Sequence, residues 1–170
     1  AFTAVNLDQA GRKAGGGAAV GERFAENPEL DLVQVSKRFY ETHTDAFDQL
    51  VCWTDTRVVT DAFAFESTVK NAIAGLGIET FDASRDFGSA GALESVINMD
   101  RVAKYGDDPA VKILGESSTL AVLAHETGHR WLARFFFSDG RGGTSDLLLG
   151  RQRAHWSFFM DSEASLMAGN

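Results

Sequence analysis

The most informative part of this sequence reads TLAVLAHETGHRWLARFF, residues 119–136. Ser117 and Ser118 precede it and are residue types typical of a helix N-cap, because their hydroxyl groups accept hydrogen bonds from free backbone N–H groups. Apolar residues then recur every three or four positions and predict a helix over residues 119–136. The polar, glycine-rich segment at 138–143 is expected to end it. The predicted buried face includes Leu120, Leu123, Leu132 and Phe136.

Two histidines and a glutamate within this helix form a metal-binding pattern. His125 and His129 are four residues apart, so on a helix they lie one turn apart on the same face. Two imidazoles placed in this way can bind one Zn²⁺ at ~2.0–2.1 Å each. Glu126 is expected beside the metal as the catalytic base that deprotonates a bound water. Gly128 costs a helix about 1 kcal/mol relative to alanine, which suggests that another group passes close to the helix there.

The pattern HExxH is more specific than a pair of histidines. From average composition, it arises by accident in roughly one chain of this length in a few hundred. It also lies inside a capped, largely apolar helix, where two histidines and a glutamate are costly to bury without a purpose. The sequence therefore favours a zinc site over histidines that only pack at the edge of a core.

Residues 124–131, AHETGHRW, resemble the active-site helix of the zincin metallopeptidases. The resemblance implies an α+β fold in which a small twisted mixed sheet packs on a long active-site helix, with further helices around it. It implies zinc-dependent hydrolysis of a peptide or protein substrate that lies extended along an edge strand. Residues 93–99 stand where the family has that strand, and the substrate would pair with residues 96–98. Residues 1–170 would form one catalytic domain, whole or part of a longer chain.

The third zinc ligand must lie outside the helix. A catalytic zinc normally has three protein ligands and one open position. The metzincin pattern HExxHxxGxxH is absent, because Leu132 and Phe135 stand at the positions of its glycine and last histidine. We expect His155, the only histidine after the motif, and the segment SLMAG at 165–169 resembles the methionine turn that metzincins place beneath their metal. Two carboxylates stay open as alternatives, as in the gluzincins and in the aspartate-ligated branch: Glu163 and Asp161.

Composition excludes other classes of protein. The chain has 170 residues and a formal net charge of -8, with no basic stripe, which argues against a nucleic-acid partner. No apolar run approaches the ~18 residues that span a bilayer. Cys52 is the only cysteine, so a cysteine-based zinc site and an internal disulfide are excluded, and a buried, inert thiol is expected. The compartment and the oligomeric state stay open, although the family resemblance slightly favours a secreted or periplasmic protein.

Elsewhere the pattern of residues predicts a few elements and roles. His43 is expected at the end of a helix, where the helix dipole favours it and a structural role is more common than metal binding. Arg130 is expected to be solvated, with an oxyanion-stabilising role as the alternative, and residues 135–137 are expected in the core.

The expected elements are a strand at 2–7, a glycine-rich connection at 11–21, a helix at 32–42, a central strand within 47–59 and a strand at 93–99.

Two other classes of function compete with a peptidase. A non-catalytic metal-binding or interaction module on a zincin scaffold would bind metal and cleave nothing, since a fold does not determine a function. A purely structural domain would bind no metal and would lose no thermal stability on chelation. Both remain alternatives to the enzyme at this point.

Overall fold

The computed structural model describes residues 31–55, 62–75, 77–161 and 165–169. The chain divides into two compact units: unit 1 is Ala1–Lys70 with Asp82–Tyr105, and unit 2 is Asn71–Phe81 with Gly106–Asn170. The fold is of the mixed α+β class. The strand expected at 2–7 and the connection expected at 11–21 lie outside the described residues. Within the described part of the chain, no helix is long and apolar enough to cross a membrane.

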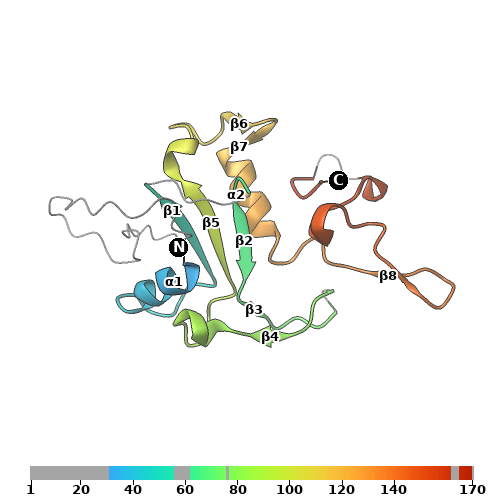
Figure 1. The fold of residues 1–170 in the computed structure, drawn as a ribbon, viewed down its shortest axis with the longest axis horizontal. Coiled ribbons are helices and arrows are strands. Elements are labelled where there is room, and N and C mark those ends of the chain that lie inside the picture. The colour runs from blue at the N-terminus through green and yellow to red at the C-terminus, as the bar shows by residue number, and fades with distance from the viewer. Residues whose placement is uncertain (1–30, 56–61, 76, 162–164, 170) are drawn as a thin grey trace. The chain divides into compact units, whose positions relative to one another are not determined.

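Unit 1 is built on a mixed sheet of three strands in the order β1-β5-β2 (Figure 1). These strands are β1 (Gln49–Thr54), β2 (Phe65–Thr68) and β5 (Ser95–Arg101). Strand β5 runs parallel to β1 and antiparallel to β2. The strand predicted within 47–59 is therefore present, but it lies at an edge of this sheet and not at its centre.

The prediction that residues 93–99 form an edge strand is wrong. Strand β5 is the central strand, and Ile97 is opposite Val51 on one side and Glu66 on the other. Its residues are buried from Ser95 to Asp100, so side chains on both faces of the strand are shielded from solvent. Because both edges of β5 are already paired, a substrate cannot extend the sheet along residues 96–98.

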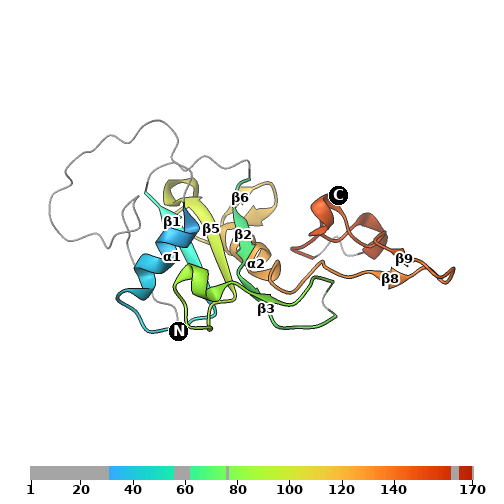
Figure 2. The ribbon, with the colours of Figure 1, turned by 60° about the horizontal axis from the view of Figure 1, so that its bottom comes forward.

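Helix α1 (Leu32–Tyr40) covers one face of this sheet and confirms the helix predicted at 32–42 (Figure 2). Its N-cap is Asp31, whose carboxylate accepts a hydrogen bond from the backbone N–H of Gln34 at 3.0 Å. Basic residues in the last turn suit the negative end of the helix dipole. The helix contributes Phe39 to a core cluster with Leu50, Val69, Leu93 and Val96.

Unit 2 is built from short elements. A small hairpin of β6 (Lys112–Leu114) and β7 (Ser117–Ser118) leads into helix α2 (Thr119–Gly128). A second hairpin pairs β8 (Phe137–Ser138) with β9 (Thr144–Ser145). The remaining elements of the chain are β3 (Lys70–Asn71), β4 (Phe81–Asp82) and the 3₁₀ turns Ser84–Phe87, Val102–Lys104, Arg151–Arg153 and Phe158–Met160.

Helix α2 begins where the sequence predicts and ends earlier. The hydroxyl of Ser118 accepts a hydrogen bond from the N–H of Ala121 at 3.2 Å, which confirms the N-cap. The helix has ten residues and ends at Gly128, whose carbonyl accepts hydrogen bonds from the N–H groups of Trp131 and Leu132. Ala133 then adopts a left-handed backbone with φ of 55°, which a continuous helix cannot contain. The long active-site helix packed on a sheet is thus not confirmed.

The predicted buried face of this helix is wrong for three of its four residues, and the fourth, Leu123, is partly buried. Leu120, Leu132 and Phe136 are all exposed, and Leu120 keeps 54% of its surface in contact with solvent. The helix buries a different and more polar stripe, which consists of Thr119, Val122 and Glu126. Arg130, expected to be solvated, is fully buried. Period alone cannot tell which of two apolar stripes faces a core, and here the stripe that carries Glu126 does so.

Candidate metal centre

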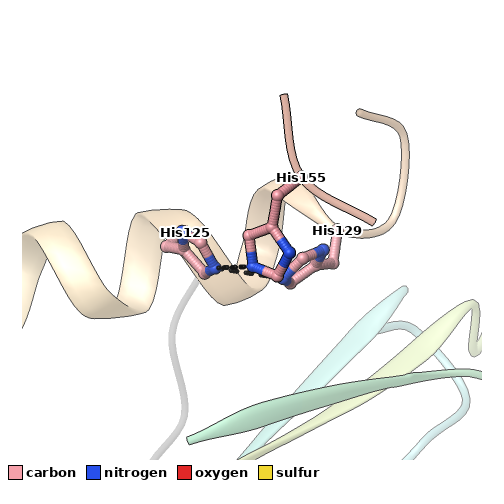
Figure 3. A group of neighbouring side chains, drawn as sticks. All are labelled: His125, His129 and His155. Atoms are coloured by element: carbon pink, nitrogen blue, oxygen red, sulfur yellow. Dashed lines mark hydrogen bonds between the residues drawn. The ribbon is translucent and has the colours of Figure 1, made fainter. Parts of the chain in front are cut away.

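Three histidine side chains of unit 2 converge on one point (Figure 3). His125 lies in the last turns of α2, His129 is the residue that caps this helix, and His155 comes from the segment after the 3₁₀ turn Arg151–Arg153. The Nε2 atom of His125 is 3.1 Å from that of His129 and 3.1 Å from that of His155. All three possible ligand atoms lie within 4.8 Å of one another, close enough to hold a metal ion.

Backbone carbonyl groups orient two of the three rings. The Nδ1 atom of His125 bonds to the carbonyl oxygen of Leu166, and that of His155 bonds to the carbonyl oxygen of Arg151 at 2.9 Å. A carbonyl oxygen only accepts, so each Nδ1 must carry the proton. In a neutral ring the proton on Nδ1 leaves Nε2 with a free lone pair. Both Nε2 atoms are therefore in the form that binds a metal, and they face each other.

The surroundings keep the rings of His129 and His155 neutral near pH 7. Burial, together with the neighbouring rings of His125 and His155, lowers the pKa of His129 to about 3. Burial also lowers the pKa of His155, which outweighs the opposing effect of its hydrogen bond to the Arg151 carbonyl. His155 is only 4% exposed. A neutral imidazole is the form that coordinates metals.

The geometry fits a divalent cation. Tetrahedral zinc with bonds of ~2.0–2.1 Å holds its nitrogen ligands about 3.3 Å apart. The two Nε2 separations of 3.1 Å are close to that value. Two nitrogen lone pairs directed at each other at this distance repel unless a positive charge lies between them. Three imidazoles suit zinc and also copper, nickel and iron, so the arrangement indicates a metal without naming it.

The segment that carries His155 is fixed by backbone hydrogen bonds on both sides. The N–H of Gly150 donates to the carbonyl of His155 at 2.8 Å, and the N–H of Arg151 donates to that of Gly169 at 2.9 Å. Between them Gln152 and Arg153 both adopt left-handed backbones, with φ of 58° and 56°. Such conformations cost about 1 kcal/mol or more for residues other than glycine. This tight turn brings His155 back towards α2.

Met167 packs against Gly128 of the motif. It is 2% exposed and belongs to a small core cluster with Ala133, Leu149 and the partly buried Trp156. A Cβ atom on Gly128 would lie 2.8 Å from the sulfur of Met167, closer than side chains normally approach. The expectation that another group passes close to Gly128 is therefore confirmed. The methionine of the segment 165–169 thus lies against the last turn of α2.

The other sequence-predicted site residues fall in different places. Glu126 is buried next to the first histidine, with 6% of its surface exposed. Asp161 is exposed and does not belong to the three-histidine group. Glu163 lies outside the described residues. Of the three candidates for the third ligand, His155 is the one that the described structure brings to His125 and His129.

Two further residues singled out in the sequence, His43 and Cys52 of unit 1, do not belong to the three-histidine group. The ring of His43 stacks on Phe39 with centroids 4.3 Å apart, and its Nδ1 bonds to the Phe39 carbonyl at 3.0 Å. It therefore has a structural role at the end of α1. Burial raises the pKa of the Cys52 thiol to about 12, so the thiol stays protonated and unreactive.

One residue at the centre was missed. A terminal nitrogen of Arg151, Nη2, lies 3.4 Å from the Nε2 atom of His155. Sequence reasoning gave no role to this arginine, since residues 151–153 read RQR and look like an ordinary solvated loop.

No family model matches this chain, and neither a curated protein nor a solved structure matches it. The function is therefore argued from the three histidines and their neighbours.

Proposed function

We propose that this chain binds zinc through His125, His129 and His155 and hydrolyses peptide bonds. The observation that carries the proposal is the pair of Nε2 atoms of His125 and His155, 3.1 Å apart. Each belongs to a ring whose other nitrogen bonds to a backbone carbonyl. Such an arrangement is favourable with a cation between the nitrogens and unfavourable without one.

The number of protein ligands supports a catalytic metal. Structural zinc sites are closed by four protein ligands, whereas catalytic sites have three and keep one position open. In the described part of the chain the group has three members, all histidines. A three-histidine site leaves zinc one position for water or substrate.

Glu126 is the residue that we assign to proton transfer. When bound, zinc supplies a Lewis acid that polarises a substrate carbonyl and lowers the pKa of a coordinated water. Glu126 follows His125 in the sequence, is buried, and would accept the proton released in the attack and pass it to the leaving amine. The low exposure of this carboxylate excludes bulk water from its neighbourhood, which strengthens its interaction with a nearby charge.

A non-catalytic metal site is the second candidate. It is favoured by the small apolar core of unit 2, where a metal would contribute stability as it does in small zinc domains. This candidate and the peptidase share the same ligands. They differ in whether Glu126 performs chemistry.

Replacing Glu126 by glutamine separates the two candidates. For a peptidase, Glu126→Gln should retain one metal ion per chain and lower the rate of peptide hydrolysis by about 10²–10⁴-fold. Metal content by elemental analysis and cleavage of a mixed peptide library are the measurements. Glu116→Gln is the matched control, because Glu116 is an exposed acid of the same unit that pairs with Lys112. Undiminished hydrolysis by Glu126→Gln would remove this residue from the mechanism, and a metal-loaded wild type that cleaves nothing would favour the non-catalytic site.

A further inference from the structure

Arg151 holds a permanent positive charge beside the ligand atoms. Its Nη2 atom is 3.4 Å from His155 Nε2, the nitrogen that we assign to the metal. A guanidinium only donates, so this contact again requires a free lone pair on that Nε2. Arginine does not lose its charge at any pH that a protein tolerates.

The position of this side chain is set by the same turn that delivers His155. The backbone N–H of Arg151 donates a hydrogen bond to the carbonyl oxygen of Gly169. The carbonyl oxygen of Arg151 accepts hydrogen bonds from the Nδ1 of His155 and from the N–H of Ala154. The backbone of Arg151 is thus held on both sides of its Cα atom. Arg153, two residues further on, instead pairs with Asp146 at 2.8 Å. Of these two arginines, Arg151 is the one whose guanidinium faces the histidines.

A bound metal ion would remove the hydrogen bond of Arg151 to His155 and would place a second positive charge near its guanidinium. Once Nε2 of His155 coordinates a cation, its lone pair can no longer accept from the guanidinium. A divalent ion and a guanidinium a few ångströms apart also repel each other. A second arginine, Arg134, donates to the carbonyl of His129 at 3.0 Å and adds to the positive field at the site. The arrangement becomes favourable when an anionic oxygen lies between the metal and the guanidinium.

We propose that Arg151 is an anion-binding residue of this centre, which holds a negatively charged oxygen of the substrate against the open position of the metal. The inference rests on the proposed function and specifies its substrate: a group with an anionic oxygen next to the reacting carbonyl. Two sources share this chemistry, namely a carboxylate of the substrate and the oxyanion that develops during hydrolysis. A charge-assisted hydrogen bond from arginine suits either.

Acetate is the probe that tests this assignment without catalysis. The protein is loaded with Co²⁺, whose visible absorption reports on its ligands, and acetate is titrated into wild type, Arg151→Gln and Arg151→Lys. Glutamine at 151 keeps the backbone carbonyl that orients His155 and removes the charge. We expect the acetate dissociation constant to rise tenfold or more in Arg151→Gln and by less in Arg151→Lys, while Co²⁺ content is unchanged. Arg153→Gln is the control and should stay within about twofold of wild type, since its charge pairs elsewhere.

The outcomes separate this inference from the proposed function. Equal acetate affinity in wild type and Arg151→Gln would overturn the role of Arg151, and so would a loaded wild type that binds no acetate. Arg151-dependent binding of acetate without any peptide cleavage would keep the anion site and remove the peptidase. For an active enzyme, a fall of kcat in Arg151→Gln identifies the oxyanion as the partner, and a rise of KM alone identifies a substrate carboxylate.

Discussion

The two units of this chain stabilise themselves in different ways. Unit 1 has a continuous apolar core in which α1 and the sheet meet, and its central strand is buried along six consecutive residues. Among the described residues of unit 2, the apolar cluster built on Ala133, Leu149 and Met167 is small. Unit 2 also leaves many large apolar side chains exposed, among them Leu120, Trp131, Leu132, Phe136, Leu147, Phe158, Phe159 and Leu166.

The difference shows where a metal would matter most. Burial of apolar surface stabilises unit 1 regardless of ligands. In unit 2 the described centre is polar and consists of three histidines whose lone pairs converge. A unit with a small core commonly depends on a cross-link, and a metal held by residues 30 positions apart in sequence, His125 and His155, is one.

The largest expected effect is therefore a selective stabilisation of unit 2 by zinc. At a free metal concentration 1,000 times the dissociation constant, binding adds about 4 kcal/mol to the stability of the state that binds. We expect hydrogen exchange of the α2 amides (Thr119–Gly128) to slow strongly on loading and that of β5 (Ser95–Arg101) to change little. The measurement is exchange followed by mass spectrometry, with and without a chelator. An equal gain of protection in α2 and β5 would contradict the prediction that the metal stabilises unit 2 selectively.

A smaller change in the stability of unit 2 is expected when the metal-free protein is acidified. His129 and His155 have pKa values below the ordinary 6.5 in the folded chain, so the unfolded chain binds more protons as the pH falls through 6.5. Stability that depends on these rings is present above pH 6.5 and is lost progressively towards about pH 3, the pKa of His129. Unit 2 should therefore weaken in this range.

Unit 1 should stay folded to a lower pH than unit 2. Burial tends to raise the pKa of Asp45, but hydrogen bonds from the Ser89 hydroxyl and the Ala92 N–H outweigh it and lower the pKa below 3.8. The stability from this carboxylate is lost only as the pH falls below 3.8. Indole N–H signals in NMR spectra distinguish the units, since Trp53 belongs to unit 1 and Trp156 packs on the Met167 cluster. Loss of both signals at the same pH would contradict the prediction that unit 2 unfolds before unit 1 as the pH falls.

The smallest expected effect comes from Gly128→Ala. Alanine favours a helix by about 1 kcal/mol over glycine. The added Cβ would meet the buried sulfur of Met167 at 2.8 Å, however, and crowding of a packed site costs about 1–3 kcal/mol. We expect a net loss of about 1 kcal/mol in urea unfolding, together with weaker metal binding. Gly106→Ala is the control, because the nearest atom to its Cβ lies at 3.9 Å.

A double-mutant cycle checks the cause of this loss. If crowding against Met167 is responsible, then Gly128→Ala should cost less in a Met167→Ala background than in the wild type. Additive effects of the two substitutions would show that the two residues do not interact.

The sequence predicted those features that depend on neighbours in the chain. The start of α2 was correct because a serine N-cap acts on backbone groups within the same turn. The approach of another group to Gly128 was correct because glycine is costly in a helix unless space requires it. The proximity of His155 to the motif followed from the scarcity of histidines, and its role as a ligand stays a prediction.

Features that depend on distant contacts were not predictable. The central place of β5 is decided by pairing with two strands from other parts of the chain. The left-handed Ala133 rules out a continuous helix up to residue 136, although alanine normally continues a helix. The contact between Arg151 and His155 forms across a turn in which Gln152 and Arg153 adopt left-handed backbones, and neither residue type signals this turn. The stripe of α2 that is buried depends equally on what surrounds the helix.

The main-chain partners of His125 and His155 have a consequence for how this protein tolerates sequence change. In many metal sites an acidic side chain orients the ligand histidine, and one substitution can remove it. Here the oxygens of Leu166 and Arg151 do so, and every amino acid has that oxygen. Substitutions at positions 151 and 166 therefore leave the orientation of both rings unchanged, and at position 151 only the anion-binding role that we propose for the arginine depends on its side chain.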